Sequence, residues 1–130
     1  MDLNFFKKTR ILDGGMGQEL LARGMKPNGT LWSANALLNE EYHKLLLDTH
    51  LDFIKAGAEV IVTTTFTTRK IRLKDNQVED KFEYLNKKAG EIALKAKKQN
   101  PNILIAGGLP PQYLTYEADN REDKEIMDNF

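Results

Sequence analysis

An acid followed by a group of glycines stands near the start of the chain, in the stretch ILDGGMGQEL, residues 11–20. Glycines here could form a phosphate-binding loop. However, the dinucleotide-binding pattern needs a further glycine where this chain has Leu20, and no Gly-Lys-Ser/Thr follows. An acid at the end of a strand can instead bind the ammonium group of an amino acid. The exposed backbone N–H groups beside it can bind the carboxylate of the same amino acid. The alternative interpretation is that Asp13 only caps the helix that follows.

Threonines, histidines and two aromatic residues are the other candidates for chemistry. The threonines among residues 63–68 could line a pocket with hydroxyls, although a β-branched run is also ordinary strand material. His43 and His50 share one face of a predicted helix but lie about 10 Å apart by helical rise, which is too far to chelate one ion. We therefore expect surface or packing roles for both. Trp32 and Tyr113 could wall a pocket or fill a hydrophobic gap.

The elements that must position these residues alternate between strands and helices. Short apolar or β-branched runs predict strands at residues 10–13, 59–66 and 103–106. Apolar residues at helical spacing predict helices at residues 16–23, 34–38, 39–56 and 78–98, and the charged segment 119–130 could begin another. Ser33 and Asn39 are expected to be helix N-caps, and the polar residues 67–76 are expected to form a loop.

This alternation predicts an α/β fold with parallel strands and right-handed helical crossovers. Each predicted strand ends in a polar or glycine-rich loop: DGG, TTTFTT or GGLPP. Ligands of α/β folds bind at the carboxyl ends of the strands. We therefore expect these loops to converge on one side of the molecule.

Composition excludes several classes of protein and site. The chain has 130 residues, the size of one ordinary domain, with 41% hydrophobic and 29% charged residues. Its 19 basic and 19 acidic residues balance, which gives no electrostatic footprint for nucleic acid or an acidic membrane. With neither a signal-peptide core nor a membrane-span pattern, the expected location is cytoplasmic. No cysteine occurs, so disulfides, a cysteine nucleophile and a thiolate metal site built from this chain alone are excluded.

Four stretches taken together resemble the homocysteine S-methyltransferase family, which includes betaine-, S-methylmethionine- and folate-dependent members. They are ILDGGMGQELLARG, LWSANALL, HLDFIKAGAEVIVTTTF and IAGGLPPQYLTYEAD. They occur in family order and at family-like spacing across nearly the whole chain. The last stretch is most similar to the branch of the family that has a Leu-Pro-Pro loop.

The resemblance implies a (β/α)8 barrel enzyme that moves a methyl group from S-methylmethionine, betaine or a similar donor to the sulfur of homocysteine, giving methionine. The acid of the family's DGG motif contacts the substrate's amino group, a role that falls on Asp13, with Gly14 and Gly15 shaping the same site. Thr64 and Phe66, in the segment after the second predicted strand, complete the predicted substrate-binding residues. Many relatives have asparagine where this chain has Thr64, and we expect the lost amide to alter how a loop or substrate is held.

The resemblance also implies a zinc ion that this chain cannot hold in the family's way. Three cysteine thiolates bind the family's zinc, which activates the homocysteine sulfur as a thiolate. No zinc ligand and no catalytic residue is therefore assigned within this chain. A barrel needs about 250 residues, and residues 1–130 correspond to about the first three strands with their helices. We expect a single, incomplete homocysteine-binding domain with little or no activity alone, which is either marginally stable or self-associates through its open barrel edge.

Two other functions remain open from the residues. One is a non-catalytic α/β module that binds an amino acid or serves in assembly. The other is an unrelated phosphate-binding α/β domain, which the missing lysine and the incomplete glycine pattern disfavour.

Overall fold

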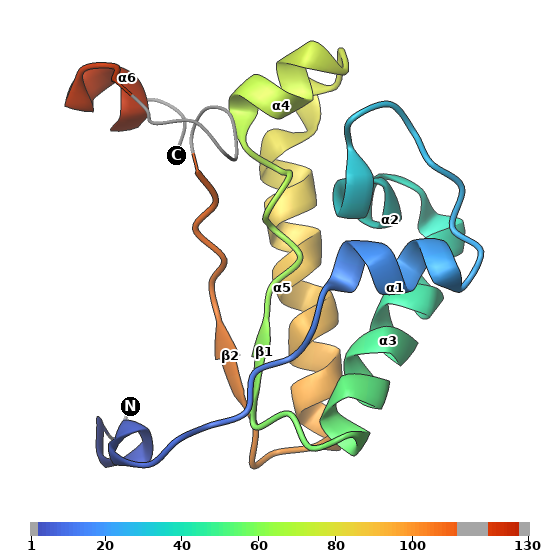
Figure 1. The fold of residues 1–130 in the computed structure, drawn as a ribbon. Helices are drawn as coiled ribbons and strands as arrows, with labels where there is room; N and C mark the ends of the chain where they lie inside the picture. Colours follow the sequence, from blue (N-terminus) through green and yellow to red (C-terminus); the bar gives the residue numbers. More distant parts are fainter. Residues whose placement is uncertain (1–2, 112–119, 128–130) are drawn as a thin grey trace.

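The computed structural model describes residues 3–111 and 120–127, in which helices and short strands alternate (Figure 1). The strands are β1 (Val60–Val62) and β2 (Leu104–Ala106). The α-helices are α1 (Met16–Ala22), α2 (Asn35–Leu38), α3 (His43–Lys55), α4 (Lys70–Asp75), α5 (Phe82–Gln99) and α6 (Asp123–Met127). Short 3-10 helices cover Leu3–Lys7, Trp32–Ala34, Glu40–Tyr42 and Glu79–Lys81.

The strands run parallel, as the alternation predicts. β1 pairs with β2 in the register Val60 to Leu104 and Val62 to Ala106. On the other side of β1, Leu12 forms a parallel bridge with Val60, and the Asp13 N–H donates to the Val60 carbonyl at 3.0 Å. The spatial order is therefore residues 10–13 (the first segment), then β1, then β2. The predicted α/β class with parallel strands is confirmed.

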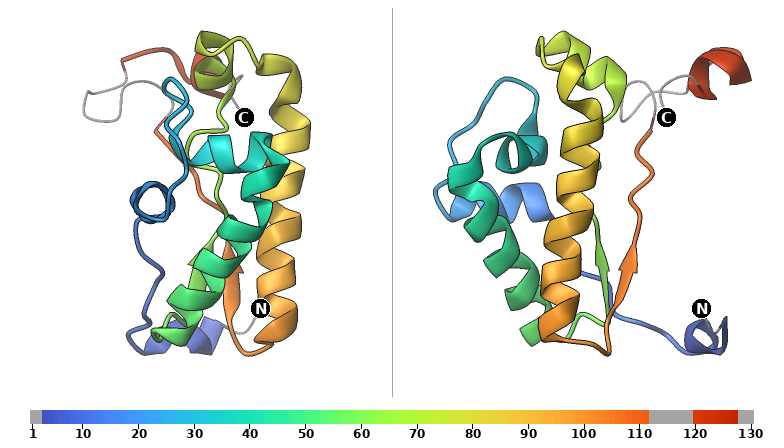
Figure 2. Two further views of the ribbon diagram at one scale, coloured as in Figure 1. Left: turned by 90° about the vertical axis from the view of Figure 1, so that its right-hand side faces the viewer. Right: turned by 180° about the vertical axis from the view of Figure 1, so that it is seen from behind.

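The two long helices pack on one side of the strands, as the two views of Figure 2 show. α3 contacts β1, α5 contacts β2, and the two helices contact each other. Ile61 of β1 is fully buried in a cluster with Ala93 and Ala96 of α5. The apolar face of α5 therefore packs against the strands and α3, and its lysines lie on the outer side of the helix.

Three predicted boundaries are wrong. Residues 59–66 form a strand only over Val60–Val62, because the hydroxyls that follow bond to loops. Thr65 Oγ1, for example, donates to the Gly108 carbonyl at 3.0 Å. Residues 10–13 contribute one bridge rather than a full strand. Residues 67–76, expected as a loop, contain α4, whose Leu73 is fully buried in the core.

Of the two predicted N-caps, Ser33 is wrong, whereas Asn39 does occupy the N-cap position of Glu40–Tyr42. Ser33 lies inside the 3-10 helix Trp32–Ala34, and its hydroxyl lies 3.4 Å from that of Thr67. Asn39 precedes the next helical turn, but its amide donates to Asn35 Oδ1 at 2.7 Å instead of capping. Neither side chain makes a capping hydrogen bond, because Ser33 pairs with Thr67 and Asn39 bonds back to Asn35.

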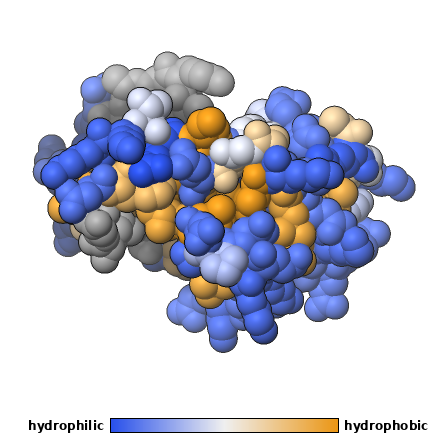
Figure 3. All heavy atoms as spheres, turned by 90° about the horizontal axis from the view of Figure 1, so that it is seen from below, coloured by the Kyte–Doolittle hydropathy of each residue, from blue (hydrophilic) through white to orange (hydrophobic). Residues whose placement is uncertain are grey.

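The face seen from below the view of Figure 1 exposes hydrophobic side chains between hydrophilic ones (Figure 3). In the first segment, Ile11 and Leu12 are both more than half exposed. Neither the outer edge of this segment nor that of β2 pairs with another strand in the described part of the chain. Within that part, too, no helix has the length and apolar character needed to span a membrane.

These open edges predict self-association. Unpaired N–H and C=O groups along a strand are templates for pairing with another chain. We expect the purified chain to show an apparent mass that rises with concentration when size-exclusion chromatography is coupled to light scattering. A monomer at every concentration that also unfolds cooperatively would contradict this expectation.

Candidate functional site

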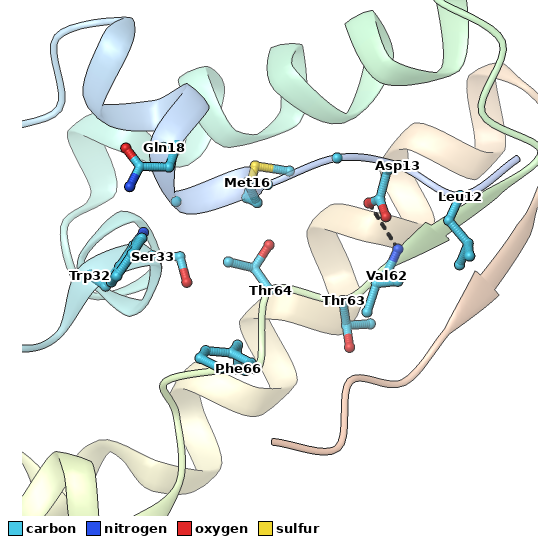
Figure 4. Close-up of a pocket in the computed structure, with 13 residues that line it drawn as sticks. Leu12, Asp13, Met16, Gln18, Trp32, Ser33, Val62, Thr63, Thr64 and Phe66 are labelled. Carbon is cyan, nitrogen blue, oxygen red and sulfur yellow. Dashed lines mark hydrogen bonds between the residues drawn. The ribbon is translucent and has the colours of Figure 1, made fainter. Parts of the chain in front are cut away.

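A cavity of about 480 Å³ opens where the first segment and β1 end (Figure 4). Its walls come from three parts of the chain: the end of the first segment with the start of α1, the 3-10 helix that begins at Trp32, and the end of β1 with the residues after it. All five predicted site residues line it, namely Asp13, Gly14, Gly15, Thr64 and Phe66. Leu12, Met16, Gly17, Gln18, Trp32, Ser33, Val62 and Thr63 complete the lining.

Asp13 is a buried carboxylate on the wall of this cavity. Its side chain is only 5% exposed, and Oδ2 accepts a hydrogen bond from the Val62 N–H at 2.9 Å. Burial raises the pKa of the Asp13 carboxyl above its usual value, although the backbone hydrogen bonds act in the opposite direction. No lysine or arginine of the described residues forms an ion pair with it. A buried carboxylate without a cation is costly, so this site favours a cationic ligand.

His50 lies behind Asp13 and is fully buried on α3. Its Nδ1 is 4.0 Å from Asp13 Oδ2 and has no hydrogen-bond partner, while its Nε2 lies 3.5 Å from Thr64 Oγ1. Burial lowers the pKa of His50 to about 4, so the ring is neutral at physiological pH. His50 therefore does not neutralise the Asp13 carboxylate.

The loops after β1 and β2 meet, as predicted. The Gly108 N–H donates to Thr63 Oγ1 at 3.2 Å, and the Arg69 guanidinium donates to the Pro111 carbonyl. Among the described residues, however, the loop at residues 107–111 contacts the threonines without lining the cavity. The threonines thus divide their roles, with Thr64 facing the cavity and Thr65 holding the loop. Tyr113, the other predicted wall residue, lies outside the described residues.

Trp32 forms one wall of the cavity and sits directly on the backbone of α1. A Cβ atom at Gly17 would lie 1.4 Å from Trp32 Nε1, so only glycine fits beneath the indole. Gly14 makes a similar close approach to the ring of Phe53. The backbone of Trp32 has a φ of +47°, a left-handed conformation that costs a bulky residue about 1–3 kcal/mol. Such strain concentrates at functional sites, which supports a ligand-binding role for this wall.

The burial of His50 predicts a loss of stability in acid. An unfolded histidine has a pKa of about 6.5, so the unfolded chain binds this proton before the folded chain does as the pH falls. The stability contributed by neutral His50 should therefore be complete above about pH 6.5 and be lost as the pH falls toward about 4. At roughly 1.4 kcal/mol per pKa unit, the free energy of unfolding should fall by about 3 kcal/mol over this range. The raised pKa of Asp13 acts oppositely, because the folded chain retains that proton to a higher pH than the unfolded chain.

Urea unfolding at pH 7 and at mildly acidic pH measures this effect. His50→Gln should remove most of the loss between the two conditions. His43→Gln, on the same helix but partly exposed, is the matched control and should leave the loss unchanged. Equal acid sensitivity of the parent chain and the His50 variant would contradict the prediction.

The donor set of this chain does not fit the thiolate-held zinc that the family resemblance implies. The sequence has no cysteine, and no group of three or more histidine or acidic residues is placed to hold a metal ion among the residues the structure describes. Among the described residues, the cavity therefore contributes polar and aromatic groups but no cluster of metal ligands.

The sequence predicts a surface or packing role for His50 and does not predict its position beside Asp13. A usable signal was present, since His50 falls between Leu46 and Phe53 at spacings of four and three on the apolar face of α3. Met16 and Gln18 on the wall carried no such signal. They line the cavity only because the first turn of α1 passes across the end of β1 (Figure 4).

Comparisons with known proteins place nearly the whole chain in one family. A family model described as homocysteine S-methyltransferase matches residues 10–130. A homocysteine S-methyltransferase of Escherichia coli is 33% identical over 120 residues, covering 86% of this chain and 38% of that protein. Homocysteine S-methyltransferase 2 of Zea mays is 35% identical over 127 residues, covering 86% of this chain and 36% of that protein.

The fold is similar to a solved member. The crystal structure of the homocysteine methyltransferase MmuM from Escherichia coli, in its metallated form, superposes with a TM-score of 0.69 at 31% identity. The match covers 84% of this chain and 41% of that structure, so this chain spans about two fifths of the relatives' length. With the family model matching nearly the whole sequence, the chain belongs to the homocysteine S-methyltransferase family.

Proposed function

We propose that this chain binds the amino-acid end of homocysteine and forms part of the site at which a methyl donor converts homocysteine to methionine. Asp13 holds the substrate's ammonium group. Gly14 and Gly15 leave room for the amino-acid backbone, and Thr64 and Phe66 border the rest of the substrate.

The observation that supports this proposal most strongly is that Asp13 is buried on the cavity wall without a cationic partner among the described residues. A buried carboxylate on a cavity wall, anchored by the Val62 N–H and without a cationic partner among the described residues, is prepared for an ammonium ion. Binding an ammonium group there would replace the lost solvation of the carboxylate with a charge-assisted hydrogen bond. Family membership supplies the substrate class to which that ammonium belongs.

The aromatic wall fits the donors proposed for this reaction. Trp32 and Phe66 are 48% and 46% exposed at the cavity. S-methylmethionine and betaine carry a sulfonium or quaternary ammonium group, and such cations bind aromatic faces. We propose that these rings receive a cationic donor of this kind, with the Leu-Pro-Pro loop at residues 107–111 supporting the segment that carries Phe66.

The sulfur chemistry requires groups that this chain does not supply. A thiol with a pKa of about 8.5 is mostly protonated at neutral pH and reacts poorly until it is activated. The chain has no cysteine to hold an activating zinc. We therefore expect the purified 130-residue chain to form no methionine from homocysteine and S-methylmethionine or betaine, with or without added zinc. Methionine formation above the uncatalysed rate would contradict this expectation.

Isothermal titration calorimetry with two matched ligands tests the binding proposal. Homocysteine and its desamino analogue 4-sulfanylbutanoate share the thiol and the carboxylate and differ only in the ammonium group. Binding of homocysteine at least tenfold more tightly than the analogue supports the proposal. Equal affinities, or no heat with either ligand, would favour a non-catalytic assembly module instead.

A further inference from the structure

Among the described residues, His50 is a buried polar side chain with an unpartnered nitrogen close to the proposed substrate-binding acid. Its Nδ1 has no hydrogen-bond partner and lies 4.0 Å from Asp13 Oδ2, while its Nε2 lies 3.5 Å from the Thr64 hydroxyl. The two residues next to the ring, Asp13 and Thr64, line the cavity, whereas His50 itself does not. The ring therefore stands directly behind two residues that a ligand would touch.

The tautomer of this ring follows from its surroundings. A neutral histidine has one N–H donor and one lone-pair acceptor. If Nδ1 carried the lone pair, that lone pair would face a buried carboxylate oxygen, and the two acceptors would repel each other. With the proton on Nδ1, a donor instead of an acceptor lies 4.0 Å from the carboxylate oxygen, and Nε2 can accept from the Thr64 hydroxyl. In this second tautomer both ring nitrogens have a suitable partner, Asp13 for Nδ1–H and the Thr64 hydroxyl for Nε2.

We propose that His50 is a positioning residue for Asp13: its Nδ1–H donates to Asp13 Oδ2 in the ligand complex, and the Thr64 hydroxyl holds the ring in that tautomer. This inference rests on the proposed function of Asp13. The present separation is about 1 Å longer than a hydrogen bond, and contacts of this kind often tighten only when ligand is bound. With Oδ2 held by His50 and the Val62 N–H, Oδ1 is left for the substrate's ammonium group.

Imidazole ¹⁵N chemical shifts, recorded at neutral pH on chain labelled in histidine, test the inference without any ligand. The sequence has only two histidines, so His43→Gln assigns the signals. We expect the Nδ1–H tautomer for His50 in the parent chain and a shift toward Nε2–H in Asp13→Ala, which removes the acceptor. The Nε2–H tautomer in the parent chain, or His50 ¹⁵N chemical shifts that are unchanged by Asp13→Ala, would overturn the inference.

Two amide variants provide a second readout that does not depend on the ring signals. The amide of His50→Asn can place an N–H near the position of Nδ1, whereas that of His50→Gln reaches the position of Nε2. We expect homocysteine to bind His50→Asn within about threefold of the parent chain and His50→Gln about tenfold more weakly. Equal effects of the two variants, with similar thermal unfolding, would show a purely structural role.

The two readouts separate this inference from the function on which it rests. Homocysteine binding that depends on Asp13, together with the wrong His50 tautomer, overturns the positioning role and leaves the proposed function standing. The expected tautomer in a chain that does not bind homocysteine overturns the proposed function, and with it the substrate-positioning role of His50.

Discussion

Asp13→Asn is expected to abolish measurable homocysteine binding while leaving the fold intact. The substitution keeps the shape of the side chain and an oxygen that can accept from the Val62 N–H, but it removes the negative charge. Losing one partner of a buried charged hydrogen bond costs about 2–5 kcal/mol, so the affinity should fall by at least about thirtyfold. Calorimetry on the parent chain and the variant measures the change.

The same variant should be as stable as the parent chain or more stable. Its carboxylate is buried without a cationic partner in the described part of the chain, and replacing such a charge with a neutral group removes a desolvation cost. Lost binding with retained or increased stability is typical of a residue kept for function. Asp48→Asn, at an exposed ion pair with Lys44 on α3, is the matched control and should change neither property by much. A destabilised Asp13→Asn that still binds homocysteine would contradict this account.

Gly17→Ala is expected to break the aromatic wall of the cavity. The added Cβ would lie 1.4 Å from Trp32 Nε1 and 2.0 Å from Cδ1, so the indole or α1 must move. Overpacking of this kind costs about 1–3 kcal/mol of unfolding free energy. Since Trp32 is the single tryptophan of the chain, its fluorescence reports the displacement and the urea unfolding curve reports the stability.

The control for this variant is another alanine substitution at a helical glycine. Gly90 lies in α5, and a Cβ there would meet nothing within 4 Å. Gly90→Ala should leave the tryptophan emission unchanged and be neutral or stabilising by up to about 1 kcal/mol, because alanine favours helices. An unchanged emission spectrum and unchanged stability in Gly17→Ala would show that the wall adapts without cost, contrary to the geometry described above.

The sequence predicted the helices better than the strands, for a physical reason. α3 and α5 carry long apolar faces with a helical period, and such faces can be identified without knowing what they pack against. β1 and β2 are three residues each, too short for a period, and their neighbours decide where they end. The threonines after Val62 have strand propensity, but their hydroxyls bond to the loop at Gly108 and to nearby groups.

The same contrast applies to the site. Asp13 and the glycines after it could be selected from the sequence, because an acid and glycines at a strand end suggest a ligand before any fold is known. The strain at Trp32 and the contact of its ring with Gly17 could not be predicted from the sequence. The helical spacing of His50 placed it on the apolar face of α3, but did not predict that Asp13 would lie beside it. The Gly17 contact joins α1 to the 3-10 helix at Trp32, and the approach of His50 to Asp13 joins α3 to the end of the first segment. Both contacts form only when segments that are separate in the sequence have packed together.

The most direct test of the central claim is a crystal structure of the chain soaked or grown with homocysteine. The account predicts the ligand in the cavity at the end of β1, with its ammonium nitrogen about 2.8 Å from an oxygen of Asp13 and its side chain running toward Thr64 and Phe66. Homocysteine bound with its ammonium group away from Asp13, or bound only outside this cavity, would contradict the account.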